Sequence, residues 1–287
     1  MTSLPERAVR RCYRVLNPLH SCTYFAPETA EELGQLGVKE PRGVYFAARS
    51  APLGRVGAAV VTATFYGFKH ELVAQHLPGV WDVTTPEAAI EARYTAVDAA
   101  LHRLLGADAA ASAELAEAAE LAVRATEACS RAARPLYAAH AEIPIPQSPV
   151  LALWHATTLL REHRGDGHLA LLVDAELDGL ESVVSHSASD HGMNPEWARE
   201  MRGWSEEEWA AAEDRLRERG LLAADGTLTE AGSDLRKDLE NQTDRLDRAP
   251  YEHLGAAGVE RLTELASTFA ATLVAGGAFP ADLFPKR

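Results

Sequence analysis

Alanine-rich sequence is the feature that most limits what this chain can fold into. Between about residues 109 and 139, alanine is interrupted mainly by acidic residues, as in "AELAEAAEL". Alanine has the highest helix propensity of the amino acids, and the acidic positions are typical of a solvent-exposed helix face. Proline and glycine divide most of the remaining chain into segments of helical length. The sequence therefore predicts a mainly α-helical fold.

Several prolines and glycines predict where helices begin and end. A helix is expected over residues 5–24, and a second one begins at Pro27 and ends at a glycine in "PETAEELGQLG". Pro86 begins another helix, with Thr85 as its N-cap. The apolar stretch "RGVYFAARSAPLGRVGAAVVTATFYGFKHELVAQHLPGVW" is expected at the centre of the fold. Prolines in "EIPIPQSP", residues 142–149, predict a connection, because proline breaks a helix.

Charge and hydropathy limit the partners of the chain. The 287 residues include 42 acidic and 28 basic side chains, a net charge of −14, which opposes attraction to nucleic acid or an anionic membrane. No apolar run reaches the roughly 18 residues of a membrane span, and the N-terminus "MTSLPERAVRRCYRVL" has no apolar signal core. We therefore expect a cytoplasmic protein without a membrane partner. Cys12, Cys22 and Cys129 lack metal-site spacing and are expected to be buried free thiols.

The pattern changes after Gly192. The stretch "SEEEWAAAEDRLRERGLLAADGTLTEAGSDLRKDLENQTDRL" predicts a helix, a short strand, a turn, a second strand and another helix. Asp225-Gly226 between short apolar runs is typical of a β-hairpin. Ser205 and Glu208 have the spacing of a capping box, which predicts a helix beginning just after Ser205.

Residues 205–248 resemble the winged helix-turn-helix of MarR-type regulators, through the pattern "RLRERGLL" followed by "TLTEAG". In such folds the recognition helix brings basic and amide groups to DNA. Here the corresponding helix begins with Glu206, Glu207 and Glu208, and the wing "AADGT" carries no basic residue. We therefore expect the winged helix to serve in packing or dimerisation, with DNA an unlikely partner.

The whole chain also resembles actinobacterial helix-turn-helix proteins described as SalK-like or EvbL-like. The stretches that carry this resemblance are "NPLHSCTYFAPE", "YFAARSAPLG", "ATFYGF", "LREHRGDGH", "RGWSEEEW" and "NQTDRL". The resemblance implies an all-helical N-terminal body joined to a winged helix, and it brings no established reaction.

We expect the body over residues 1–195, with a possible sub-boundary at 142–149. A winged-helix domain with closing helices is expected over 196–287. The final helix "AGVERLTELASTFAATLVAGG" has an apolar stripe suited to covering the body or to forming a homodimer, which we also expect.

The stretch "LREHRGDGH", residues 160–168, concentrates ionisable groups. Gly165 is predicted to end one helix and Asp166 to cap the next, so that His163 and His168 flank a tight bend. One interpretation is a structural helix junction. The other is a site in which both histidines, with Asp166, act as acid–base groups.

Three further residues extend the second interpretation. Arg161 and Arg164 supply donors for a carboxylate or phosphate of a ligand. Adding His186 to the two histidines gives a weak prediction of a metal or haem site, because the set lacks the spacing of a helical zinc motif. Cofactor-free chemistry is the other possibility.

Aromatic residues gather between residues 24 and 68, which predicts a packed core or an aromatic-walled pocket for a planar ligand. In the pocket interpretation His20 is a candidate catalytic group, and Arg49 is the best pointer to a bound anion, because an unpaired buried guanidinium is costly. The ligand-binding candidates are Tyr24, Tyr45, Arg49 and Tyr66. The histidines expected to be structural or exposed are His70, His76, His102, His140, His155, His191 and His253.

Two functions are the main alternatives, and a third is a scaffold protein without a ligand, which would require the aromatic and histidine clusters to be fully packed. The first is a small-molecule-binding protein, expected to be an enzyme of specialised metabolism that acts on an aromatic or polyketide-like ligand. The second is a ligand-responsive transcription regulator that contacts DNA through Arg215, Arg217 and Arg219. Sequence motifs of nucleotide-binding loops and of the hydrolase nucleophile elbow are absent from the chain.

Overall fold

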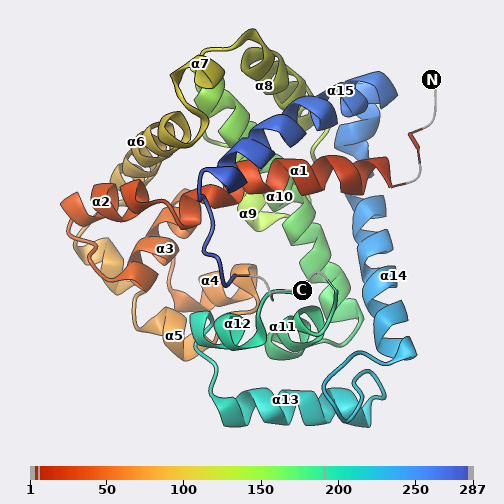
Figure 1. The fold of residues 1–287 in the computed structure, drawn as a ribbon. Coiled ribbons are helices and arrows are strands. Elements are labelled where there is room, and N and C mark those ends of the chain that lie inside the picture. The colour runs from red at the N-terminus through yellow and green to blue at the C-terminus, as the bar shows by residue number, and fades with distance from the viewer. Residues whose placement is uncertain (1–3, 6, 191, 284–287) are drawn as a thin grey trace. The chain divides into compact units, whose positions relative to one another are not determined.

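The computed structural model of the chain describes residues 4–5, 7–190 and 192–283 (Figure 1). These residues form helices joined by loops and contain no β-strand, so the mainly α-helical prediction is confirmed. Their contacts define two compact units. Unit 1 comprises Met1–Arg55, Gly79–Gly167 and Asp244–Phe279, and unit 2 comprises Val56–Pro78, His168–Thr243 and Pro280–Arg287.

Both units are discontinuous in sequence, whereas the predicted domains 1–195 and 196–287 are continuous. An early segment, Val56–Pro78, packs with later residues, and the last long helix packs with the N-terminal ones. No helix among the described residues combines the length and the apolar character needed to cross a membrane.

Unit 1 is built around two long helices that lie side by side, α1 (Ala8–Ser21) and α15 (Arg248–Ala275) (Figure 1). On α1, buried Val9, Cys12 and Leu16 recur at helical spacing and belong to the same apolar core as Leu262 and Phe269 of α15. The apolar stripe of the final helix therefore packs on other helices of unit 1. Covering the helical body was one of the two uses predicted for this stripe. The homodimer stays a prediction.

Other elements of unit 1 begin and end where the prolines and the N-cap residue predict. Pro86 begins α6, and the Thr85 hydroxyl accepts a hydrogen bond from the Ala88 N–H, as expected of an N-cap. The proline-rich segment 142–149 connects α9 to α10. The elements are η1 (Cys22–Tyr24), α2 (Pro27–Gln35), α3 (Pro41–Ser50), η2 (Ala51–Leu53), η3 (Gly79–Asp82), α6 (Pro86–Leu105), α7 (Ala107–Ala110), α8 (Ala113–Thr126), α9 (Pro135–His140) and the first part of α10 (Pro149–Asp174).

The predicted bend at Gly165-Asp166-Gly167 is wrong, because α10 runs through it without interruption. The Asp166 carboxylate does not cap its own helix. It accepts a hydrogen bond of 2.9 Å from the backbone N–H of Tyr137, in the first turn of α9. A contact distant in sequence thus replaces the local cap that the pattern Gly-Asp-Gly predicts.

Unit 2 contains a second apolar core, in which Trp209 and Leu216 of α13 belong to the same cluster as Leu180 and Val184 of α11. The predicted capping box is present, since Ser205 and Glu208 each accept from the other's backbone N–H. The elements are α4 (Ala58–Phe65), α5 (His70–Ala74), the end of α10, α11 (Gly179–Ser187), α12 (Pro195–Met201), α13 (Glu206–Glu218) and most of α14 (Glu230–Leu246).

The predicted two-stranded wing is wrong for the described residues. The Asp225-Gly226 turn forms, but only Leu222 and Leu228 pair, in a single antiparallel bridge. The chain enters α14 at Glu230, two residues after the bridge. The apolar runs on either side of the turn are therefore too short for a ladder.

Candidate functional site

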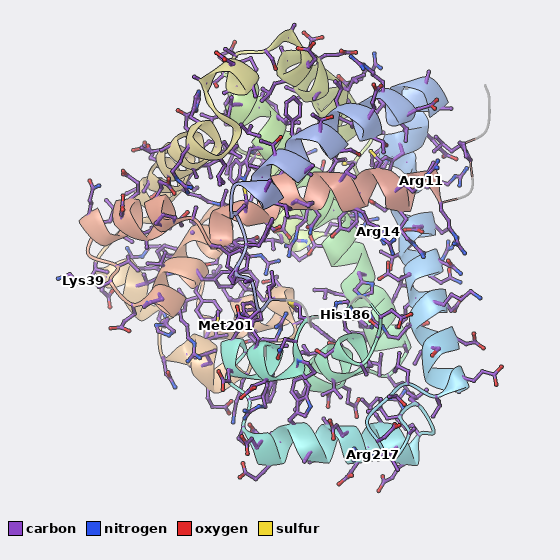
Figure 2. All side chains as sticks on the ribbon, in the orientation of Figure 1. Arg11, Arg14, Lys39, His186, Met201 and Arg217 are labelled. Atoms are coloured by element: carbon purple, nitrogen blue, oxygen red, sulfur yellow. The ribbon has the colours of Figure 1, made fainter. Side chains whose placement is uncertain are left out.

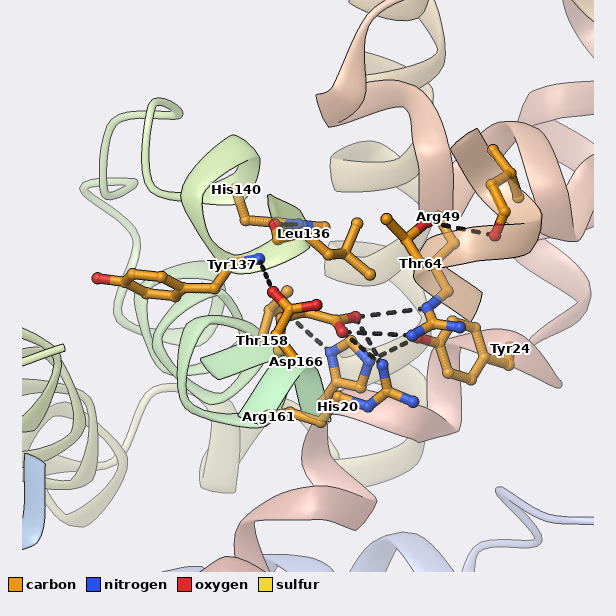
Figure 3. Close-up of polar contacts among 12 residues, drawn as sticks. His20, Tyr24, Arg49, Thr64, Leu136, Tyr137, His140, Thr158, Arg161 and Asp166 are labelled. Atoms are coloured by element: carbon orange, nitrogen blue, oxygen red, sulfur yellow. Dashed lines mark hydrogen bonds and ion pairs between the residues drawn. The ribbon is translucent and has the colours of Figure 1, made fainter. Parts of the chain in front are cut away.

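A cluster of buried polar side chains lies within unit 1 (Figure 3). His20 comes from the end of α1, Tyr24 from η1, Arg49 from the end of α3, and Glu162 from the middle of α10. The aromatic region and the 160–168 stretch, which the sequence analysis treated separately, therefore meet here. We call the following group the polar cluster: His20, Tyr24, Tyr45, Arg49, Arg93, His140, Thr158, Arg161, Glu162 and Asp166.

Glu162 is the anionic centre of the polar cluster. It is 1% exposed and accepts hydrogen bonds from Arg49, with Nη2 to Oε2 at 3.3 Å, and from Arg161, with Nη1 2.7 Å from both carboxylate oxygens. Burial alone would raise the pKa of Glu162, but the two guanidinium groups hold that pKa well below its usual value. Arg49 also donates to the hydroxyl oxygen of Tyr45 at 3.1 Å.

His20 joins two hydroxyl groups in a chain of hydrogen bonds. Its Nδ1 lies 2.8 Å from the Thr158 hydroxyl, and its Nε2 lies 2.7 Å from the Tyr24 hydroxyl. The Thr158 hydroxyl donates to the Trp154 carbonyl oxygen, so it accepts from His20 Nδ1–H. Nε2 is then unprotonated and accepts the Tyr24 proton. Burial, with the nearby arginine charges, lowers the pKa of His20 well below 6.5 and keeps the ring neutral.

Arg93 of α6 adds a third guanidinium to the polar cluster. It donates to His140 Nε2 at 3.1 Å and lies over the Trp154 ring, 4.8 Å from the centroid. Its other terminal nitrogen, Nη2, is buried without a hydrogen-bond partner among the described residues. Burial, and secondarily the Arg93 charge, lowers the pKa of His140 to about 3.

Positive charge exceeds negative charge in the polar cluster. Three arginines belong to the polar cluster, and Glu162 interacts with all of them, whereas Asp166 interacts with Arg49. Burial raises the pKa of Asp166 to about 6. Arg49 and Arg93 are buried, and the Arg161 side chain is 23% exposed. One side of the polar cluster is thus open to solvent at Arg161, with Tyr24 and Tyr45 also partly exposed.

His163, a predicted catalytic residue, lies in unit 1 but has different partners. Its Nδ1 is 2.6 Å from Asp247 Oδ1, and its Nε2 accepts from the backbone N–H of Ser130 at 3.3 Å. Both ring nitrogens are therefore occupied by the chain itself. The predicted donor Arg164 contacts Asp244 at 2.8 Å and lies over the ring of Tyr13.

Three predicted site residues belong to unit 2. The Tyr66 hydroxyl donates to the Leu177 carbonyl oxygen at 2.6 Å, and His168 Nδ1 lies 2.8 Å from the Thr243 hydroxyl. His186 Nδ1 lies 3.3 Å from Arg236 Nη2, and burial, followed by the Arg236 charge, lowers the pKa of His186 to about 4. No three His, Cys, Asp or Glu side chains of the described residues are grouped so that they could hold a metal ion. The predicted set His163, His168 and His186 is not such a group.

The residues in or beside the polar cluster that sequence reasoning missed include Glu162, Thr158, Arg93, His140 and His155. Arg93 follows Ala89 and precedes Val97 by four residues, so helical spacing alone would have placed it on the buried stripe of α6. His155 stands in the apolar run "LALWHATTLL" and contacts the Tyr94 hydroxyl. His191 lies outside the described residues.

The sequence matches the profile of a family described as a helix-turn-helix family over residues 9–280. The chain belongs to this helix-turn-helix family. Neither the curated proteins nor the solved structures gave a significant match.

In unit 2, α13 is the helix that the sequence analysis matched to a recognition helix, and α12 precedes it. A short turn joins them, and Gly203 in this turn has φ 79°, a conformation that favours glycine. The exposed residues of α13 are mainly acidic residues and alanines, with one arginine, namely Glu206, Glu207, Ala210, Ala211, Asp214, Arg215 and Glu218.

The arginines at the C-terminal end of α13 make their contacts within unit 2. Arg215 contacts Asp178 and Glu181 of the α11 N-terminus, each at 2.8 Å. Arg217 contacts Glu213 and Asp214 on its own helix. Arg219 donates to the backbone oxygens of residues 175 and 176.

Proposed function

We propose that this helix-turn-helix family member binds a small organic anion with a planar, aromatic part at the polar cluster of unit 1. The observation that carries the proposal is the surplus of buried positive charge around Glu162. Burying a charge without a counter-charge is costly, and a ligand carboxylate would supply the missing one. Guanidinium groups are suited to this task because they bind carboxylates through two parallel hydrogen bonds.

The aromatic neighbours support a planar ligand. The Tyr24 and Tyr45 rings contact each other edge to face, with centroids 5.3 Å apart, and both side chains are partly exposed beside Arg161. An aromatic or polyketide-like acid of specialised metabolism would suit this combination of partly exposed tyrosine rings and guanidinium groups.

We further propose that the protein is an enzyme in which Tyr24 and His20 exchange a proton with the ligand. The neutral His20 ring can accept the Tyr24 proton at Nε2, because the hydrogen bond to Thr158 fixes its other nitrogen as a donor. Burial raises the pKa of Tyr24 and lowers that of His20, so the two groups stay neutral until a ligand reacts. Tyr24 would take an acidic proton from the ligand while it passes its own proton to His20 Nε2 in the same step, and the Glu162 carboxylate would offset the charge that His20 gains.

Calorimetric titration with benzoate and with benzyl alcohol tests the binding proposal, since the two share a ring and differ in charge. We expect the protein to bind benzoate and Arg161→Gln to weaken that binding by about tenfold or more. Glu162 keeps Arg49 as a partner in this variant, so the fold is expected to persist. Arg131→Gln removes a largely exposed arginine of the same unit and serves as the control. Equal binding of benzyl alcohol, or equal benzoate affinity in both variants, would overturn the proposal.

The second candidate is a ligand-responsive transcription regulator, which membership in a helix-turn-helix family favours. The acidic exposed face of α13 and the internal ion pairs of its arginines argue against phosphate contacts by this helix. We therefore expect no saturable binding to DNA from upstream of its own gene at low salt. Saturable binding that is lost on changing Arg215, Arg217 or Arg219 would instead favour the regulator.

A further inference from the structure

Arginines collect at the N-terminal end of α1, in unit 1, and none of them belongs to the polar cluster. Arg10, Arg11 and Arg14 follow each other at spacings of one and three residues, which places them on one side of the helix, and Arg7 precedes the helix as its N-cap. Figure 2 labels Arg11 and Arg14, which both extend from this helix. The opposite side of α1 is buried against the core of unit 1.

The four arginines line a hollow of about 330 Å³. Arg7, Arg11 and Arg14 are exposed, and Arg10 is partly buried. This volume falls within the range of small-molecule sites, roughly 300 to 1,000 Å³. A hollow lined by guanidinium groups is suited to one chemical class of ligand, a compound with several negative charges.

One carboxylate that contacts these arginines, that of Asp244, is shared between two cations. Asp244 contacts Arg10 through Oδ2 and Arg164 through Oδ1, each at 2.8 Å. It therefore offsets at most part of the positive charge. Like charges three and four residues apart on a helix repel each other, and a bound anion would offset this repulsion.

The N-terminus of α1 also favours the binding of an anion. Arg7 is the N-cap residue, at φ 63°, and its side chain makes no capping hydrogen bond. The first turn of α1 contains no acidic residue. The positive end of the helix dipole and the arginines therefore both attract anions. Acidic residues are usually preferred at this end of a helix, and here arginines stand in their place.

We propose that Arg7, Arg10, Arg11 and Arg14 form a binding site for a small compound with two or more phosphate groups. Each phosphate can accept two parallel hydrogen bonds from one guanidinium, which matches several arginines around one hollow. The site is separate from the polar cluster and does not depend on the ligand proposed there.

Calorimetric titration of the full chain with inorganic tripolyphosphate tests the site, with a short duplex DNA as the second titrant. We expect tripolyphosphate to bind, and Arg11→Gln with Arg14→Gln to weaken it by about tenfold or more. The double variant Arg55→Gln with Arg131→Gln removes two exposed arginines elsewhere in unit 1 and should bind as the unchanged protein does.

The other outcomes overturn the proposal. Failure of tripolyphosphate to bind, or equal affinity in both double variants, removes the site. Duplex DNA binding through Arg11 and Arg14 without tripolyphosphate binding would assign these arginines to a nucleic acid backbone instead. Because both variants keep Arg49, Arg93 and Arg161, the benzoate titration is unaffected by these results.

Discussion

His20 is held in one tautomer by its two hydroxyl partners. Nδ1–H donates to Thr158, Nε2 accepts from Tyr24, and burial keeps the pKa of the ring well below 6.5. We expect long-range ¹H–¹⁵N spectra of the histidine rings to show His20 protonated at Nδ1 alone, without change between pH 5 and pH 8. Thr158→Val removes the acceptor and should shift the tautomer. A titration of His20 near its usual pKa would contradict this arrangement.

Asp166 gives a second prediction, on stability. Burial raises its pKa from 3.8 to about 6, so the native state binds this proton more tightly than the unfolded state. The contribution of Asp166 to stability therefore falls as the pH rises from about 4 to about 6 and is constant above that.

Asp166→Asn keeps an oxygen that can accept from the Tyr137 N–H and cannot ionise. In urea unfolding, the unchanged protein should lose stability relative to this variant, by on the order of 2 kcal/mol, between pH 4 and pH 7. A pH-independent difference between the two proteins would show that the carboxyl is not perturbed.

The residues of the polar cluster could be predicted only in part. Arg49 was singled out because a buried guanidinium needs a counter-charge, and the structure gives it Glu162, 113 residues away. Nothing local to either residue identifies the other as its partner. Arg93 carried a usable signal, its position on the apolar face of α6, whereas the exposure of Arg161 depends on packing that helical spacing does not define.

At the scale of elements, the two glycines of α10 have different surroundings. A Cβ at Gly167 would lie 2.6 Å from Arg134 Nη1, which donates to the His163 carbonyl oxygen, while Arg134 Nη2 donates to that of Leu246. A Cβ at Gly165 would meet its nearest atom, in Glu162, at 3.8 Å, an ordinary contact.

These surroundings predict opposite effects of the same substitution. Gly165→Ala should stabilise the chain by about 0.5 to 1 kcal/mol, because alanine favours the helix. Gly167→Ala should destabilise it by about 1 to 2 kcal/mol, because Arg134 must leave carbonyl groups that are then unsatisfied. Thermal or urea unfolding of both variants measures the difference. Stabilisation by both would contradict the close approach of Arg134.

Helix ends were predictable where the stop or start signal is local. Thr85 with Pro86, and Ser205 with Glu208, cap their helices as the sequence indicates. The Gly-Asp-Gly bend was not predictable in the same way, since Asp166 serves the N-terminus of α9. The wing was overpredicted because the turn signal at Asp225-Gly226 is real but the flanking runs support one bridge only.

At the scale of the whole molecule, buried histidines predict sensitivity to acid. Burial, before any other cause, lowers the pKa values of His140 to about 3 and of His155 and His186 to about 4. Each folded pKa lies below the unfolded value of 6.5, so these histidines cost no stability above about pH 6.5. They destabilise the native state as the pH falls from there to about 4.

We therefore expect the Asp166→Asn variant, which lacks the opposing carboxyl, to lose a few kcal/mol of unfolding free energy between pH 7 and pH 4.5. Urea unfolding at these two pH values measures it. A stability that is unchanged or higher at the lower pH would contradict the burial of three neutral histidines.

The division into two units was the least predictable feature at this scale. The segment Val56–Pro78 belongs to unit 2, and the last long helix belongs to unit 1. Each unit is therefore assembled from three separate stretches of the chain. Composition and the residues that start and stop helices do not predict this assembly from separate stretches. They depend on neighbours along the chain and not on which helices pack together.

The central claim is that an organic anion binds at the polar cluster, and ¹⁵N spectra of the histidine rings during a benzoate titration test it most directly. His20 lies inside the polar cluster, whereas His163 of the same unit is occupied by Asp247 and the Ser130 N–H. We predict that saturating benzoate shifts the His20 ring signals and leaves those of His163 in place. Unchanged His20 signals, or a shift of His163 alone, would contradict the claim.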